Sequence, residues 1–204
     1  TFILFTNNDT CNGSDTMTIT VNPLPLVDAG LDQAICINDT TQFNASGAVS
    51  YEWDTQATLS DSTINNPMVF PTVTTQYIVE GTDALGCVNT DTIILAINAL
   101  PIVSAGSDAD VCINDTVFLN ASGANTYSWA PIASLTDPNI NNPGAFPTVT
   151  TTYTVTGIDI NLCENTSDIT LTVNALPIVD AGTDTTICIN DNANLLATGA
   201  TTYS

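Results

Sequence analysis

The chain has 204 residues, of which 44% are hydrophobic, and it contains 21 acidic residues but no lysine, arginine or histidine. With no cation to replace the counterions at phosphate groups, this charge excludes nucleic acid as a partner, and the same repulsion excludes anionic membrane surfaces. The apolar content excludes a disordered acidic tail, and no apolar run reaches the roughly 20 residues that span a bilayer, so membrane insertion is not expected.

The sequence repeats itself at a fixed interval. The word Cys-Ile-Asn-Asp begins at Cys36 and returns at Cys112 and Cys188, 76 positions further on each time (36, 112 and 188). Self-similarity at such a period indicates a tandem array of small domains. We expect complete repeats at residues 22–97 and 98–173. The C-terminal strands of a preceding repeat are expected at 1–21 and the N-terminal strands of a following repeat at 174–204, as in a piece cut from a longer array.

Alternating apolar and polar residues predict strands, and no stretch shows helical periodicity. Gly, Pro and Asn clusters separate the strands at the roughly 8–12-residue spacing of a β-sandwich. In the first complete repeat we predict strands at Pro25–Ala29, at Gln33–Ile37, up to Ala45, around Tyr51 and Trp53, at Met68–Phe70, and in a hairpin of Tyr77–Glu80 with Asp91–Ile97. Three sets of residues are predicted to point inward: Thr41, Phe43 and Ala45; Val117, Leu119 and Ala121; and Ala193, Leu195 and Ala197.

The linker between repeats is short and contains proline, as in Asn98-Ala-Leu-Pro101 and again from Asn174 to Pro177. Short linkers with proline are stiff. The expected arrangement is therefore a rod-like array of domains.

Several words recur in a fixed order, namely Ala-Gly-x-Asp, Ile-Cys-Ile-Asn-Asp-Thr, Tyr-x-Trp, Asn-Asn-Pro and Phe-Pro-Thr-Val-Thr-Thr. In this order they resemble the immunoglobulin-like, PKD-like repeats of large Bacteroidota surface proteins, which often accompany type IX secretion sorting domains and gliding-type adhesins. The resemblance implies an all-β tandem of immunoglobulin-like (PKD-like) sandwiches, secreted to the bacterial cell surface, with a spacer or adhesive role. The family commonly places Gly before its second cysteine, as at Gly86-Cys87, whereas Leu162 precedes Cys163.

Each complete repeat carries two cysteines, Cys36 with Cys87 and Cys112 with Cys163. In a repetitive, extracellular-looking chain these indicate disulfides, and without histidine they cannot close a tetrahedral zinc site. The simplest prediction is one disulfide within each repeat. If the first and last strands pair in parallel, however, the two cysteines of a repeat lie further apart than the Cα separation of ~7 Å that a disulfide spans. Cys36 with Cys163 is then the rival pairing, and free thiols or links between chains are the remaining alternatives.

The aromatic residues fit positions known from immunoglobulin-like folds. Trp53 and Trp129 match the core tryptophan, and Tyr77 and Tyr153 match the tyrosine near the start of strand F. Core packing is the first interpretation, and a sugar-stacking platform is the alternative.

Three aspartates recur in register at Asp32, Asp108 and Asp184. Calcium takes six to eight oxygen ligands, which a domain junction rich in Asp and Asn could supply. No calcium-binding loop motif is present, however, and Asp or Asn at turns usually bonds the backbone. Turn chemistry is therefore the first interpretation and a calcium site the alternative; no other cofactor is expected.

Two patterns suggest glycosylation. Asn38 and Asn114 begin Asn-x-Thr sequons. The family resemblance further implies O-linked sugars where Asp-Thr precedes an apolar residue, which occurs at Thr16, Thr92 and Thr116.

No residue pattern indicates catalysis, since the chain has no histidine base, no lysine or arginine for an oxyanion, and no phosphate-binding motif. We therefore predict a non-enzymatic structural repeat segment of an extracellular filament, stalk or adhesin shaft, whose partners are copies of itself. The alternative is a ligand-binding ectodomain that recognises a carbohydrate or protein ligand through loops such as Ala57–Asn66.

Overall fold

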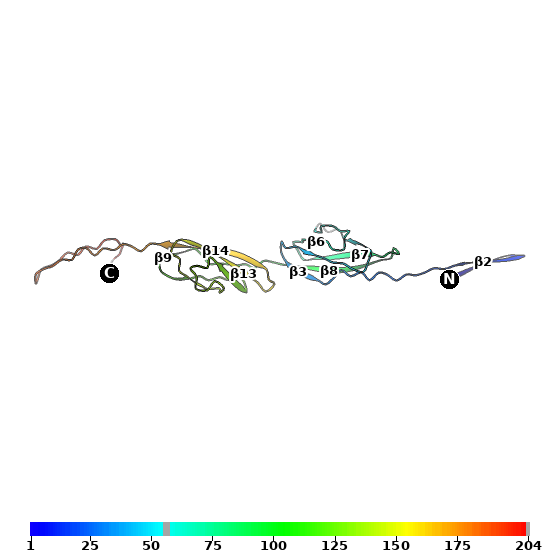
Figure 1. Cartoon of the computed structure of the whole chain (residues 1–204), viewed down its shortest axis with the longest axis horizontal. Coiled ribbons are helices and arrows are strands. Elements are labelled where there is room, and N and C mark those ends of the chain that lie inside the picture. The colour runs from blue at the N-terminus through cyan, green and yellow to red at the C-terminus, as the bar shows by residue number, and fades with distance from the viewer. Residues whose placement is uncertain (55–57, 203–204) are drawn as a thin grey trace. The chain divides into compact units, whose positions relative to one another are not determined.

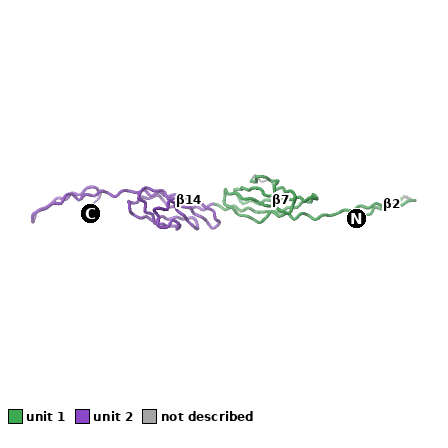
Figure 2. The backbone as a smooth tube through the Cα atoms, viewed as in Figure 1, with its two compact units in different colours: residues 1–99 green, residues 100–204 purple. Residues whose placement is uncertain are grey.

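The structure is a computed structural model, and it describes residues 1–54 and 58–202. Within these residues the regular secondary structure is entirely β (Figure 1). No helix among them has the length and hydrophobicity needed to cross a membrane. The chain divides into two compact units, Thr1–Ala99 and Leu100–Ser204 (Figure 2).

The first unit contains a sandwich whose larger sheet pairs its first strand with its last. This sheet has the order β3 (Gln33–Cys36), β8 (Val88–Asn98), β7 (Thr75–Thr82) and β5 (Ser50–Trp53). β3 runs parallel to β8, and the other neighbours are antiparallel. The opposite layer contains the antiparallel pair β4 (Thr41–Gln42) and β6 (Met68–Val69).

The second unit repeats this arrangement strand for strand. Its larger sheet has the order β11 (Thr126–Ala130), β13 (Thr151–Ile158), β14 (Glu164–Asn174) and β9 (Ala109–Cys112), with β9 parallel to β14. The opposite layer contains β10 (Val117–Phe118) and β12 (Gly144–Ala145). The recurrence of strand order and direction shows that the sequence period corresponds to a structural period.

Each sandwich has its own core, which its alternating strands fill from both layers. Trp53, Tyr77 and Phe43 are fully buried in the first core, and the Phe43 ring centroid lies 5.2 Å from that of Trp53 and 5.1 Å from that of Tyr77. Trp129 and Tyr153 are buried at the same places in the second core, where Leu119 replaces Phe43. The predicted core role of the tryptophans is confirmed.

The layer opposite the larger sheet, here called the outer layer, is less regular than the alternation of apolar and polar residues predicts. The strand expected at Pro25–Ala29 is reduced to an isolated bridge between Asp28 and Ser46, because Gly30 directly follows with a φ of 90° and turns the chain. The strand expected up to Ala45 ends at Gln42, although the Ala45 N–H still bonds the Asn65 carbonyl at 2.7 Å. The outer layer is thus held together by isolated backbone hydrogen bonds between segments that have no regular secondary structure.

The two ends of the described chain carry strand-forming sequence that no second layer covers. β1 (Phe2–Asn8) and β2 (Cys11–Met17) form a hairpin whose described side chains are exposed. Residues 174–202 make one isolated bridge, between Asp180 and Thr198. Ala193, Leu195 and Ala197, which are predicted to point inward, are all exposed, so their predicted burial in a core is not observed. Their equivalents in the second sandwich are buried only because β11, β13 and β14 pack over them.

Candidate functional site

The cysteines distinguish the two repeats from each other. Cys36 and Cys163 are disulfide-bonded. Cys87 and Cys112 carry free thiols. The prediction of a disulfide within each repeat is therefore wrong, and the rival pairing of Cys36 with Cys163 stays a prediction.

The parallel pairing of first and last strands explains this outcome. Cys36 lies opposite Asn98, at the C-terminal end of β8, whereas Cys87 directly precedes Val88 at its N-terminal end. At about 3.3 Å per residue, the length of β8 separates the two cysteines by roughly 30 Å. A disulfide needs Cα atoms within about 7 Å, so the fold forbids a bond between them.

The recurring aspartates Asp32 and Asp108 fasten the segment before the first strand to the last strand. Asp32 Oδ1 accepts the backbone N–H of Ile94 at 2.8 Å, and Asp108 Oδ1 accepts that of Thr170 at 2.7 Å. A second fastening lies nearby in the first sandwich, where Asp91 Oδ2 accepts the N–H of Ala29 at 2.8 Å. In the second sandwich the hydroxyl of Ser167 takes the place of that carboxylate.

These contacts bear on the expected calcium site. Asp32, Asp108 and Asp184 are all exposed, and the first two already bond the backbone. Among the residues that the structure describes, no group of three or more His, Cys, Asp or Glu side chains is placed to hold a metal ion. Calcium binding at these residues stays a prediction from the sequence.

A different aspartate caps the turn before each second cysteine. Asp83 Oδ1 accepts the N–H groups of Leu85 and Cys87, both at 2.8 Å. Asp159 Oδ1 does the same for Asn161 and Cys163, at 2.8 and 2.9 Å. Each carboxylate thus accepts backbone N–H groups of the turn in place of a backbone carbonyl.

The turn before Cys163 keeps its geometry despite the loss of glycine. Gly86 has a φ of 80°, and Leu162, which occupies the same position, has a φ of 65°. Left-handed backbone suits glycine and is strained for a leucine. The departure from the family pattern therefore costs conformational energy but does not change the turn.

The glycosylation candidates lie on the surface. Asn38 and Asn114 both have a φ of 72° at the turn that follows the first cysteine, and both side chains are exposed. Thr16, Thr92 and Thr116 are exposed as well. Each of these residues is accessible to a glycosyl group, and the modification itself stays a prediction.

The aromatic residues considered for sugar stacking lie inside the sandwiches. Trp53 is fully buried, and its Nε1–H donates to the Ile64 carbonyl at 2.9 Å. The hydroxyls of Tyr77 and Thr58 bond at 2.7 Å. Burial raises the pKa of Tyr77 above its usual range, since the charged phenolate would lose its hydration.

The loop considered for ligand recognition has one ordered turn in its described part; its first residue, Ala57, lies outside the described residues. Asp61 Oδ1 accepts the backbone N–H and the hydroxyl of Thr63, both at 2.8 Å. The backbone bond and then the hydroxyl bond from Thr63 lower the pKa of Asp61. This carboxylate is therefore engaged in local turn bonds.

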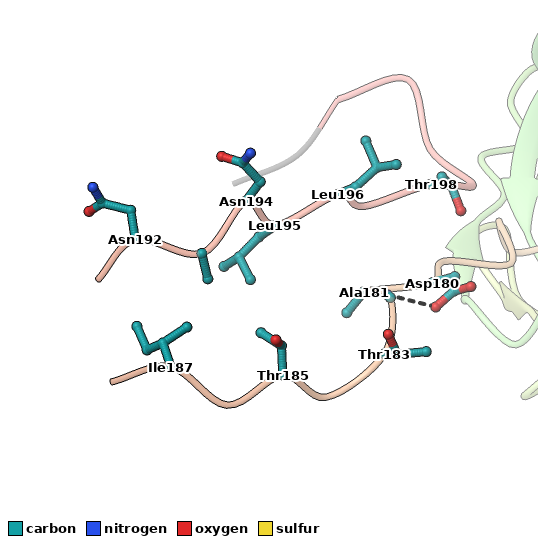
Figure 3. Close-up of a pocket in the computed structure, with 12 residues that line it drawn as sticks. Asp180, Ala181, Thr183, Thr185, Ile187, Asn192, Asn194, Leu195, Leu196 and Thr198 are labelled. Carbon is teal, nitrogen blue, oxygen red and sulfur yellow. Dashed lines mark hydrogen bonds between the residues drawn. The ribbon is translucent and has the colours of Figure 1, made fainter. Parts of the chain in front are cut away.

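The open groove drawn in Figure 3 is an uncovered core. Residues 180–187 and 192–198 line it from two sides. Ala181, Ile187 and Leu195 face the groove at the positions that Ala105, Val111 and Leu119 occupy in the buried core of the second sandwich. The groove is lined by polar as well as apolar residues, and the correspondence of these three apolar residues to core positions distinguishes it from a preformed ligand pocket.

The topology of both units now fixes the fold. Two sheets enclose a tryptophan-centred core, and the first strand of the larger sheet pairs with its last. The chain is a tandem of immunoglobulin-like domains.

Comparison with solved structures finds immunoglobulin-like tandems of low similarity. The insect immune protein hemolin is 11% identical with a TM-score of 0.40, and the match covers 84% of this chain and 55% of the hemolin chain. The first two immunoglobulin domains of DIP-gamma are 8% identical with a TM-score of 0.37, covering 74% of this chain and 98% of that chain. The N-terminal Ig1-2 module of the Drosophila receptor protein tyrosine phosphatase DLAR is 10% identical with a TM-score of 0.31. This match covers 74% of this chain and 100% of the DLAR chain. No protein-family profile and no curated protein matches the chain.

Proposed function

We propose that this immunoglobulin-like tandem is a non-enzymatic, load-bearing segment of an extracellular filament, stalk or adhesin shaft on a bacterial surface. The observation that carries the proposal is the parallel pairing of the first and last strands in both sandwiches. Its partners are neighbouring copies of the same repeat. The bacterial surface follows from the family resemblance of the sequence words.

The parallel pairing gives each domain a mechanical role. The polypeptide enters a sandwich near β3 and leaves it through β8, so tension on the chain pulls these two strands in opposite directions. Their ladder joins Gln33–Cys36 to Leu95–Asn98, and the Ile37 N–H extends it to the Asn98 carbonyl at 2.9 Å. These bonds lie across the direction of pull and must break together, which resists unfolding more than bonds that open one at a time.

The aspartate fastenings add to the same resistance. Asp32 precedes β3 and bonds the Ile94 N–H on β8, and Asp108 precedes β9 and bonds the Thr170 N–H on β14. Each bond joins the two strands that tension would separate. Bonds that involve a charged acceptor contribute about 1.5–3 kcal/mol. The recurring acidic residues therefore serve the load path, and this use favours a structural role over an acid–base role in catalysis.

The location and solubility fit the same role. A disulfide persists in oxidising compartments outside the cytosol, and the disulfide-bonded state of Cys36 and Cys163 favours an extracellular protein. The formal charge of −21 favours solubility. Exposed Thr and Asn side chains, with sugars at the predicted sites, would protect the sheet edges in the absence of lysine.

Two measurements test the proposal. Single-molecule pulling on the whole chain should give two similar unfolding events at forces well above those of a domain whose terminal strands unzip. Electron microscopy of the native protein should show extended assemblies with one repeat per domain length. The rival function, a recognition ectodomain, predicts specific binding on a glycan or protein array and no extended assembly, and that result would replace the shaft.

A further inference from the structure

The segment 178–199 already has the backbone conformation of residues 102–123, which it repeats in the sequence. Asp180 and Thr198 exchange two backbone hydrogen bonds, at 3.0 and 2.9 Å, as the equivalent residues of both sandwiches do. Gly199 has a φ of 92°, and the equivalent glycine of the second sandwich has a φ of 91°. This part of a sandwich is therefore formed although no second layer covers it, and a preformed surface loses little entropy on binding.

Three apolar side chains of this segment are exposed although their equivalents lie in a core. Ile187 is 56% exposed and Leu195 is 83% exposed, whereas Val111 and Leu119 at the same positions are 8% and 2% exposed. Ala181 is exposed as well. Ile187 and Leu195 point into the groove from its two sides (Figure 3). We call Ala181, Ile187 and Leu195 the open face, because a core forms there only when another layer covers it.

The hairpin of β1 and β2 has the register of the hairpin that closes each sandwich. Phe2 lies opposite Met17, as Tyr77 lies opposite Ile93 in the first sandwich. The next core-facing pair matches in the same way: Leu4 with Asp15, and Val79 with Asp91. The turn of this hairpin is one residue shorter, so positions in β1 match those 75 residues later (2 and 77), and positions in β2 match those 76 later (17 and 93).

The side chains that this register places at core positions are exposed in the hairpin and in the residues that follow it. We call them the hairpin face: Phe2, Leu4, Met17 and Ile19. Their equivalents in the first sandwich are all fully buried: Tyr77, Val79, Ile93 and Leu95. The hairpin face thus carries, in register, the apolar side chains that cover the outer layer of a complete sandwich.

We propose that the hairpin face of one copy of the chain covers the open face of a second copy. The inference rests on the proposed function, and it states how neighbouring copies meet. Residues 19–22 of the first copy pair in parallel with residues 185–188 of the second, as β14 pairs with β9. Among the described residues, 185–188 belong to no ladder. The contact is therefore the addition of strands to an open edge, with alternate side chains buried beneath them.

Two aspartates occupy the places of the carboxylates that fasten the first sandwich. In the docked pair, Asp184 of one copy accepts the backbone N–H of Thr18 of the other. Asp15 accepts the backbone N–H of Ala181 across the same contact. The equivalent bonds are formed within the first sandwich, from Ile94 to Asp32 and from Ala29 to Asp91. The third of the recurring aspartates thereby takes the same backbone role as the first two.

The docked pair is less complete than a sandwich in two respects. Neither the hairpin nor the segment 178–199 contains an equivalent of Trp129, so the new sheet has three strands and its core has no tryptophan. Thr6 takes the place of Gly81, where an added Cβ would lie 2.6 Å from the Val27 side chain. The equivalent Val179 must therefore shift its side chain to admit Thr6. Three strands with a covered apolar face suffice for a stable sheet, and we expect a contact weaker than the interior of a sandwich.

Sedimentation velocity of the whole chain over a range of concentrations tests the inference. Each copy carries one hairpin face and one open face, so the contact is heterologous and should give a concentration-dependent series of oligomers. Added sodium chloride should shift the series toward larger oligomers, because it screens the repulsion between chains of charge −21. A chain that stays monomeric at every concentration and salt would overturn the inference.

A charge on the open face should prevent docking. Leu195→Asp should weaken association by about 100-fold or more, because the docked core would bury an unpaired carboxylate. Leu195 is exposed in the single copy, so this variant does not disturb either sandwich. Ile178→Asp is the matched control, since Ile178 and its equivalent Ile102 are both 89% exposed. Equal losses in the two variants would show that added charge alone is responsible, and they would contradict docking at the open face.

Mixing two variants tests the polarity of the contact. Met17→Asp damages the hairpin face and leaves the open face intact, whereas Leu195→Asp does the reverse. Each variant alone should be monomeric, and an equimolar mixture should form dimers and nothing larger. Phe5→Asp is the control for the hairpin, because its equivalent Glu80 is exposed in the first sandwich. A mixture that forms no dimer, or that continues beyond the dimer, would overturn the inference.

Hydrogen exchange locates the contact in the associated protein. Amide protection should rise at residues 19–22 and 185–188, and a rise confined to other residues would contradict the proposed ladder. Extended assemblies that form equally well with Leu195→Asp would overturn only this inference, because the copies then meet through another surface. A chain that stays monomeric and whose two sandwiches unfold at low force would overturn the proposed function as well.

Discussion

The carboxylate of Asp108 accepts a hydrogen bond from the backbone N–H of Thr170, 2.7 Å away and on the last strand of the same sandwich. Asp108 precedes β9, and Thr170 lies on β14, so the bond fastens the entry of the chain to its exit. The first sandwich has the same bond between Asp32 and Ile94. The pair thus links a recurring acidic residue of the sequence to a mechanical feature of the fold.

Asp108→Ala should lower the free energy of unfolding of the second sandwich by about 1–2 kcal/mol, because a charge-assisted bond is lost and the Thr170 N–H keeps no side-chain acceptor. Denaturant titration followed by fluorescence measures this. In a Trp53→Phe background only Trp129 reports, since the chain has two tryptophans and one lies in each core.

Asp108→Asn is the control for this effect. The amide oxygen keeps the geometry and the acceptor without the charge, so the loss should be at most half that of the alanine variant. Equal losses in both variants would show that charge, and not the bond to Thr170, is responsible.

Leu162→Gly should stabilise the second sandwich by a few tenths to about 1 kcal/mol. Leu162 holds a φ of 65° and is 81% exposed, so the substitution relieves left-handed strain of about 1–2 kcal/mol and loses little packing, while glycine raises the entropy of the unfolded chain. The reverse change Gly86→Leu should destabilise the first sandwich. A destabilising Leu162→Gly variant would mean that the side chain makes a contact worth more than the strain.

Gly123→Ala should prevent the second sandwich from folding stably. A Cβ at this position would lie 1.8 Å from the Ile102 carbonyl oxygen, at a φ of 91°. Gly106 has a similar φ of 92°, but its nearest neighbour would be 3.8 Å from the added Cβ. Gly106→Ala should therefore cost only the conformational strain of about 1–2 kcal/mol, and the difference in melting temperature between the two variants measures the close approach alone.

The stability of the first sandwich should fall as the pH rises above about 10, the ordinary pKa of tyrosine. Burial raises the pKa of Tyr77 in the folded state, so above that pH the unfolded chain loses its proton while the folded chain keeps it. Unfolding then releases a proton and is favoured by alkali. Unfolding monitored by Trp53 fluorescence in a Trp129→Phe background measures the slope.

Tyr77→Phe isolates this titration. The variant loses the hydroxyl and its bond to Thr58, so it is less stable at neutral pH but should lose less stability between neutral and alkaline pH. An identical alkaline slope in the variant would assign the effect to repulsion among the carboxylates of this cation-free chain and contradict the role of Tyr77.

Sugars at Thr16, Thr92 and Thr116 are predicted by the sequence pattern, and all three residues are exposed. The intact mass of the native protein should exceed that of the polypeptide by whole sugar units. Substituting Thr92→Val should remove one increment, whereas Thr90→Val, also on an exposed part of β8 but not preceded by Asp, should not. A native mass equal to the bare polypeptide would contradict the prediction.

The alternation of apolar residues was sufficient to predict the strands of the larger sheets. Tyr77 and Val79 are buried and Ile78 lies exposed between them, as a two-residue period requires. The outer layer was harder to predict, because its bonds, such as that from Phe43 N–H to the Pro67 carbonyl, join short irregular segments far apart in sequence. No local pattern reports a bond of this kind.

The sequence by itself determined the period, the all-β class, the tryptophan-centred cores and the absence of any cation, because each depends on residue types at fixed spacing. The tertiary structure decided that Cys36 and Cys87 do not pair, since the parallel register of β3 with β8 carries them to opposite ends of one sandwich. It also decided that Leu195 is exposed while its equivalent Leu119 is buried. Burial depends on a second layer that lies over the strand, and a strand's own sequence does not specify whether that layer is present.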